Sequence, residues 1–194
     1  NSLWWNNGDG TFTPDDGTLL ADDPAWTSSA AIVDVNRDGH PDIYDVNYLA
    51  ASDLFERICG TSEKPHICNP VVFDGAADRL LLSNGAGGLR DATEESGIAF
   101  PDGRGLGIVA GRIDGDRSID LYIANDMAAN RLLLGPAQIA EDDPPRFEEA
   151  AVLRGAAFDL SGKSQAGMGI AATDVDGNGQ LDLLVTNFLF ENNA

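Results

Sequence analysis

The sequence predicts an all-β protein. Three segments are typical of short strands, because they are rich in aliphatic and aromatic residues and are bounded by turn residues. These segments are DIYDVN (42–47), DLYIAN (120–125) and DLLVTN (182–187). Asn-Gly and Asp-Gly steps in NNGDG (6–10) and SNGAG (83–87) are strong signals for β-hairpins. The best helical pattern, at residues 47–58, is weak, so we expect strands to dominate.

The chain also repeats itself, in two patterns that each occur three times in the same order. The first is an apolar strand and a glycine turn, and its copies are 1–12, 78–89 and 130–135. The second is a small apolar strand, an acidic loop and another strand, and its copies are 31–47, 108–125 and 170–187. About four strands per unit are typical of a β-propeller blade. We therefore expect one domain over residues 1–194, a propeller-like array of about three four-stranded blades. Its sequence units are 1–77, 78–129 and 130–194, with an insertion at 48–77.

The charge of the chain limits its partners. The 194 residues include 12 basic and 32 acidic side chains, a formal net charge of −20. Such a balance excludes nucleic acid and anionic membrane surfaces as partners. No apolar run approaches the roughly 18 residues of a membrane-spanning helix. Since so many carboxylates repel one another in a compact body, the composition favours bound cations.

Two cysteines, Cys59 and Cys68, enclose a short loop in ICGTSEKPHIC. A disulfide across this loop is the favoured interpretation, and it indicates an oxidising, extracellular compartment. Half of a zinc site is the alternative, with His66 as a third ligand. That alternative lacks an obvious fourth ligand and the short cysteine spacing that zinc sites use.

The acidic loops are candidate cation sites. In DVNRDGHPD (34–42) and DVDGNGQLD (174–182), acceptor side chains alternate along the chain and glycine stands at position six. Ca²⁺ takes six to eight oxygen ligands, and alternate side chains of a curled loop can all point inward. Position seven contributes a main-chain carbonyl in this arrangement. The candidate ligands are Asp34, Asn36, Asp38, His40 and Asp42 in loop one, and Asp174, Asp176, Asn178, Gln180 and Asp182 in loop three.

Loop two departs from this pattern. Arg112 replaces the first aspartate and Arg117 the glycine, whereas Asp114, Asp116, Ser118 and Asp120 keep the other positions. Because a guanidinium at position one can itself neutralise the carboxylates, we expect no tightly bound ion here. An EF-hand is the closest alternative interpretation for loops one and three. It requires flanking helices and a glutamate at position twelve, and the sequence has neither.

Nothing in the sequence favours catalysis. The two histidines, His40 and His66, have no apparent Ser or Cys partner for a nucleophilic site. The paired carboxylates are better explained as calcium ligands and solvated turns than as a glycosidase pair. Trp4, Trp5 and Trp26 can stack on a sugar, but tryptophans in blade strands are more often part of the core. We therefore expect a protein that is not an enzyme.

The acidic loops and the NSLWWNNGDGTF segment (1–12) together resemble the FG-GAP or VCBS repeat, which builds the calcium-binding propellers of integrin α chains and many secreted bacterial proteins. Residues 165–188 and 68–98 resemble the repeat and the cysteine-bearing connection of the cartilage acidic protein-like subgroup. The resemblance covers most of residues 1–190. It implies Ca²⁺ ligands at the matched positions of loops one and three, and a role in adhesion or scaffolding.

The first and last repeat units are both incomplete. Residues 1–12 form the closing half of a unit, and the last unit has its acidic half without a closing half. The amino-terminal strand can complete the last blade within one molecule, or complete the last blade of a neighbouring subunit by strand addition. Alternatively, the 194 residues are part of a longer chain or larger propeller. The expected function is thus a calcium-stabilised extracellular structural or adhesion protein, with head-to-tail copies of itself forming a filament. The alternative is a calcium-dependent module that binds glycans or other extracellular proteins.

Overall fold

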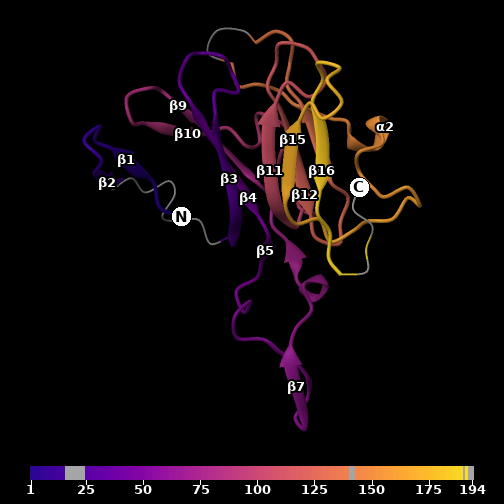
Figure 1. The fold of residues 1–194 in the computed structure, drawn as a ribbon. Helices are drawn as coiled ribbons and strands as arrows, with labels where there is room; N and C mark the ends of the chain where they lie inside the picture. The colour runs from indigo at the N-terminus through magenta and orange to yellow at the C-terminus, as the bar shows by residue number, and fades with distance from the viewer. Residues whose placement is uncertain (16–24, 140–142, 190, 192–194) are drawn as a thin grey trace.

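A computed structural model describes residues 1–15, 25–139, 143–189 and 191. The fold is all-β, as the sequence predicts, and is made of small antiparallel sheets (Figure 1). The first sheet has the order β3-β4-β9-β10, and its strands are β3 (Thr27–Val33), β4 (Asp42–Asn47), β9 (Arg79–Ser83) and β10 (Leu89–Asp91). The second sheet has the order β11-β12-β13-β14, and its strands are β11 (Gly105–Gly111), β12 (Asp120–Asn125), β13 (Arg131–Leu134) and β14 (Glu148–Glu149).

Two further sheets have two described strands each. The amino-terminal hairpin pairs β1 (Trp4–Asn6) with β2 (Phe12–Pro14), and the third sheet pairs β15 (Ile170–Thr173) with β16 (Asp182–Val185). A single helical turn, α2 (Ala151–Arg154), follows β14. Each four-stranded sheet combines the acidic half of one sequence unit with the closing half of the next unit. The unit boundaries at 78 and 130 therefore fall inside sheets and not between them.

The first two sheets are close structural copies. Both carry a register shift at the same place in their first strand, between Thr27 and Ser29 and between Gly105 and Gly107. The first strands β3, β11 and β15 lie next to one another, with β11 in contact with both of the others. One apolar cluster lies between the first and second sheets, and its fully buried side chains include Tyr44, Leu80 and Leu121. A second cluster joins the second sheet to Val185 of the third.

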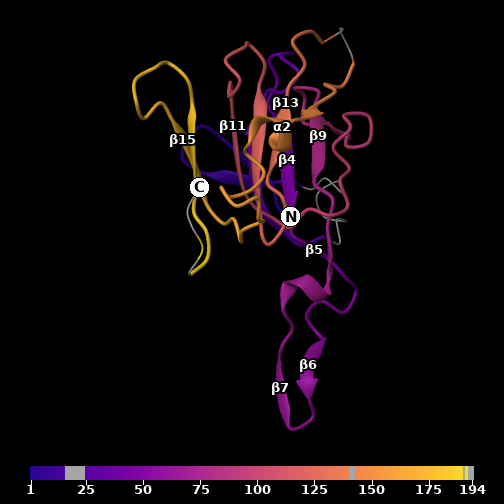
Figure 2. The ribbon, with the colours of Figure 1, turned by 90° about the vertical axis from the view of Figure 1, so that its right-hand side faces the viewer.

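The insertion at 48–77 leaves the body of the molecule as a protruding arm (Figures 1 and 2). A short pair of strands closes its base, and a hairpin forms its tip. The elements are β5 (Leu49–Ala50), β6 (Ile58–Thr61), β7 (Lys64–Ile67), the 3₁₀ turn η1 (Pro70–Val72) and β8 (Asp74–Gly75). The weak helical prediction for residues 47–58 is wrong, because this segment ends β4, contributes β5 to a strand pair and then turns.

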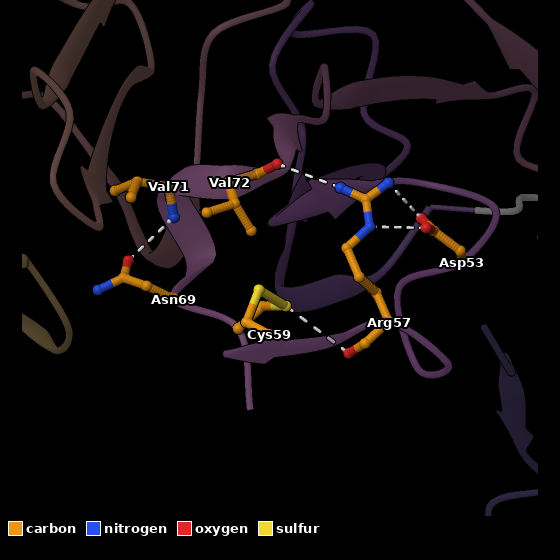
Figure 3. Close-up of a disulfide and its surroundings, with 7 residues drawn as sticks. Asp53, Arg57, Cys59, Asn69, Val71 and Val72 are labelled. Atoms are coloured by element: carbon orange, nitrogen blue, oxygen red, sulfur yellow. Dashed lines mark hydrogen bonds and ion pairs between the residues drawn. A yellow bond between two sulfur atoms is a disulfide. The ribbon is translucent and has the colours of Figure 1, made fainter. Parts of the chain in front are cut away.

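A disulfide joins Cys59 and Cys68 in this arm, with their Cα atoms 5.0 Å apart. The prediction of a disulfide is confirmed in this structure, and two cysteines bonded to each other offer no thiolates to zinc. Arg57 binds Asp53 through two N–H groups at 2.6 and 3.0 Å, and Asn69 caps η1 by accepting the N–H of Val71 (Figure 3). Within the described ranges, no helical segment has the length and apolar character of a bilayer-spanning helix.

The three tryptophans correct another expectation. Trp4 is 57% exposed, Trp5 41% and Trp26 43%, so none of them belongs to the core. Trp26 packs edge-on against Tyr48 and next to Phe55. Trp4 and Trp5 lie on β1, which in the described chain pairs only with β2. Neighbouring side chains of a strand point to opposite faces of its sheet, so these exposures show that neither face of the hairpin is fully covered at β1.

Asp78 is a buried acid that directly precedes β9 of the first sheet. Its carboxylate accepts the main-chain N–H of Asn47 at 2.8 Å and the hydroxyl of Tyr44 at 3.0 Å. Burial raises the pKa of Asp78 to about 6, although these hydrogen bonds and the charge of Arg131 oppose the shift. A raised pKa means that the native protein holds this proton more tightly than the unfolded chain does.

Replacing Asp78 by asparagine is therefore expected to remove a pH dependence of stability. Between about pH 4 and pH 6, Asp78 makes the free energy of unfolding fall as the pH rises, by up to about 3 kcal/mol for a shift of this size. Urea denaturation of the wild type and of Asp78→Asn in chelator, at pH 5 and pH 7, measures the difference. The exposed Asp74→Asn is the matched control and should keep the wild-type pH dependence. An Asp78→Asn profile parallel to the wild type would contradict the assignment.

Candidate functional site

Three equivalent loops join the first and second strands of the three sheets. Loop one (34–42) connects β3 to β4, loop two (112–120) connects β11 to β12, and loop three (174–182) connects β15 to β16. The glycines at position six of loops one and three, Gly39 and Gly179, have φ of 90° and 86°. Only glycine adopts this left-handed backbone without strain, so the tight turn predicted from the sequence is present.

Position four is also left-handed in all three loops, which the sequence pattern did not reveal. Arg37, Gly115 and Gly177 have φ of 62°, 84° and 78°. Two of these residues are glycines, and a glycine at position four is the sequence feature from which this left-handed turn could have been predicted. Loop two thus keeps the turn at position four and loses the turn at position six, where Arg117 stands.

The first aspartate organises loops one and three. Asp34 accepts main-chain N–H groups from Asp38 at 3.2 Å and Gly39 at 3.0 Å. Asp174 accepts three such groups, from Gly177, Asn178 and Gly179, at 2.8 to 3.0 Å. These bonds curl each of the two loops around the carboxylate of its first aspartate. Arg112 has no acceptor with which to do this in loop two.

The last aspartate of each loop fixes the loop to its sheet. Asp42, Asp120 and Asp182 each accept the main-chain N–H of the residue seven positions earlier, at 2.7 to 3.0 Å. The second oxygen of Asp42 accepts the N–H of Ser83, and that of Asp120 accepts the N–H of Gly135, both at 2.9 Å. Burial raises the pKa of Asp42 to about 6 and also raises the pKa of Asp120.

The acidic side chains converge in two loops. Carboxylate oxygens of Asp174, Asp176 and Asp182 lie within 4.8 Å of one another, and so do those of Asp114, Asp116 and Asp120. The corresponding acids of loop one do not form such a group in the described part of the chain, and the amide of Asn36 donates to Asp38 at 2.9 Å. Position seven uses its N–H within the loop, from His40 to Asp38 and from Gln180 to Asn178, which leaves the carbonyl as the group for an ion.

Loop two differs from the expectation in one respect. The ion pairs of the described residues do not include one between Arg112 and Asp114, Asp116 or Asp120. The expected neutralisation by this guanidinium is therefore not seen. Ser118 is buried, and its hydroxyl lies 2.9 Å from the carbonyl of Pro136 and 3.2 Å from Asp116. The prediction of ions in loops one and three, and of none bound tightly in loop two, stays a prediction.

Fold and loops together define a class: a repetitive all-β protein in which three of the described sheets carry an acidic turn between their first two strands. The family model described as the FG-GAP-like repeat matches residues 1–44. That match covers the amino-terminal hairpin, β3 and loop one, so this part of the chain is similar to an FG-GAP-like repeat. The comparison with curated proteins gives no match.

Proposed function

We propose that this protein is a non-catalytic, calcium-stabilised structural or adhesion protein of the extracellular space. The observation that carries the proposal is loop three, where three carboxylates converge on one side of a loop with the complete ligand pattern. FG-GAP repeats of this kind are found in extracellular, adhesion-type proteins, which supports the role. The resemblance of residues 68–98 and 165–188 to the cartilage acidic protein-like subgroup agrees with it.

The donor atoms suit Ca²⁺. The loops offer carboxylate, amide and main-chain carbonyl oxygens, and hard cations prefer oxygen ligands. Loop three would hold its ion with Asp174, Asp176, Asn178 and Asp182 and the carbonyl of Gln180. Loop one offers Asp34, Asn36, Asp38 and Asp42 with the carbonyl of His40. Loop two offers three carboxylates but no oxygen at its first position, so we assign it the weakest affinity.

The role of the ion in this proposal is mechanical. Bound Ca²⁺ neutralises carboxylates that otherwise repel one another, and it holds each acidic turn rigid between two strands. No step of chemistry is assigned to it. The disulfide between Cys59 and Cys68 supports the extracellular location, because disulfides persist in oxidising compartments.

Isothermal titration of the chelator-treated protein with CaCl₂ tests the proposal. We expect two equivalents of Ca²⁺ to bind. Asp38→Ala and Asp176→Ala should each remove one equivalent, and Asp116→Ala should leave both. Glu56→Ala removes one charge from an exposed site outside the loops and is the matched control. Absence of binding to the wild type would refute the calcium assignment.

The alternative function is a calcium-dependent module that binds a glycan or another protein. The exposed aromatic group of Trp26 and Phe55, whose ring centroids lie 5.6 Å apart, favours it because such rings stack on sugars. A glycan array probed with and without calcium distinguishes the two functions. Specific hits that Trp26→Ala abolishes would support the binding module.

A further inference from the structure

The side chain of Arg37 links loop one to the second sheet. Arg37 stands at position four of the loop, between the candidate ligands Asn36 and Asp38. Its guanidinium donates to the main-chain carbonyls of Pro136 and Ala137, both at 3.1 Å. These two residues directly follow β13 and lie 99 and 100 positions further along the chain. The side chain therefore bridges the first sheet and the second.

The backbone of Arg37 is unfavourable for its residue type. Its φ of 62° lies in the left-handed region, where loops two and three have glycine at the same position. Any other residue is strained there and persists only where its surroundings hold it. Within the described part of the chain, the hydrogen bonds of this side chain are those to the two carbonyls. Loop one thus has a strained residue that bridges two sheets where the other loops have an unstrained glycine.

Loop two holds the same segment, residues 135–137. The main-chain N–H of Gly135 donates to Asp120 at 2.9 Å, and the carbonyl of Pro136 accepts the hydroxyl of Ser118 at 2.9 Å. A side chain at Gly135 would collide with the main chain at the end of loop two, so the segment lies directly against this loop. The carbonyl of Pro136 therefore has one donor from loop one and one donor from loop two.

The two ends of this bridge differ in how they are fixed. Ser118 and Asp120 are 2% and 0% exposed, so the end at loop two is anchored in the protein interior. Arg37 is exposed, and the direction of its side chain depends on how loop one is curled. A cation that binds both Asn36 and Asp38 fixes the residue between them. It thereby fixes the point from which the guanidinium reaches the second sheet.

We propose that Arg37 couples loop one to loop two. A cation in loop one holds Arg37 on the 135–137 segment, and this segment in turn holds loop two in place. Loop two depends on such outside support, because Arg112 at its first position has no acceptor with which to curl the loop. The coupling is reciprocal, since an interaction free energy between two sites acts equally on both. The inference rests on the calcium binding proposed above for its trigger, whereas the bridge itself can be measured without metal.

Hydrogen exchange of the Gly135 amide in chelator tests the bridge. Arg37→Gly gives loop one the residue of the other two loops and removes the bridge without adding strain. We expect it to speed this exchange about fivefold or more, the lower end of typical couplings between sites. Amides of the buried strand β4 should exchange as in the wild type, because the change is local.

Arg90→Gln is the matched control for the bridge. It removes an equal charge from an exposed arginine whose guanidinium binds Glu95 and not the 135–137 segment. The Gly135 amide of this variant should therefore exchange as in the wild type. An unchanged Gly135 amide in Arg37→Gly, or an equal change in Arg90→Gln, overturns the bridge.

The calcium response of the same amide tests the coupling. CaCl₂ should slow the exchange of Gly135 about fivefold or more in the wild type, and also in Asp176→Ala, where loop one keeps its ligands. Asp38→Ala should lose the response. Arg37→Gly should lose it too, while still binding two equivalents of Ca²⁺ in titration. A response that survives in Arg37→Gly overturns the coupling. Absence of calcium binding to the wild type would refute the proposed function and the trigger, and the exchange in chelator would still decide on the bridge.

Discussion

Removal of calcium is expected to lower the melting temperature of the protein by about 10 °C or more. A ligand that binds only the native state adds about 2.7 kcal/mol per site when its concentration is a hundred times Kd. In a chain of this size, 1 kcal/mol shifts the melting temperature by about 2–4 °C. Two sites, in loops one and three, account for the expected change. Scanning calorimetry with CaCl₂ and with chelator measures it.

A double variant distinguishes the loss of bound Ca²⁺ from any other effect of the chelator. Asp38→Ala combined with Asp176→Ala removes a ligand from each of the two loops and should melt at one temperature in both buffers. Glu56→Ala should keep the full calcium response. Mg²⁺ should restore less stability than Ca²⁺, because it prefers several waters to a shell of protein ligands. If the melting temperature of the wild type is the same with CaCl₂ and with chelator, the proposal of a calcium-stabilised fold is contradicted.

The second large effect is expected at Asp120. This fully buried carboxylate accepts main-chain N–H groups from Ile113, Asp114 and Gly135, at 2.7, 3.1 and 2.9 Å. Asp120→Ala leaves these donors without their acceptor, and an unsatisfied buried group costs about 1–3 kcal/mol. We expect a loss of about 3 kcal/mol or more in the free energy of unfolding. Urea denaturation in chelator measures it without a contribution from bound metal.

Asp116→Ala is the matched variant in the same loop. Asp116 is exposed, and among the described residues its carboxylate accepts hydrogen bonds from the main-chain N–H and the hydroxyl of Ser118 alone, so its loss should cost about 1 kcal/mol or less. Asp120→Asn should be intermediate, since an amide keeps one acceptor and turns its N–H₂ toward a donor. Equal losses for Asp116→Ala and Asp120→Ala would show that Asp120 does not anchor the loop to the sheet.

Much of the fold could be predicted because the same pattern of strands and acidic loops recurs three times in the sequence. The strands β4, β12 and β16 begin at the aspartate that closes each acidic loop, and their apolar character is plain in the sequence. The failures have physical causes. Residues 47–58 lack a helix because β5 pairs with β8 instead, a long-range contact that local pattern does not contain. The tryptophans of β1 are exposed because burial depends on what packs against the faces of the hairpin, and the repeat pattern does not contain that information.

The candidate site was predictable in its residues but not in its geometry. Alternating acceptors and a glycine at position six identified loops one and three. Loop two was predicted as a degenerate metal loop, and its Asp114, Asp116 and Asp120 do converge although Arg112 stands at its first position. The hydrogen bonds that the main-chain N–H groups of Ser83 and Gly135 donate to Asp42 and Asp120 could not be predicted either. A bond between residues far apart in the chain leaves no sequence motif.

The sequence by itself determined the strands, the order of the repeats, the disulfide and the acidic side chains of each loop, because these depend on neighbours along the chain. Only the tertiary structure decided how the halves of the sheets meet. It placed the amino-terminal hairpin against the first sheet, and among the described residues it pairs β16 with β15 alone. Strand pairing is set by packing between distant segments.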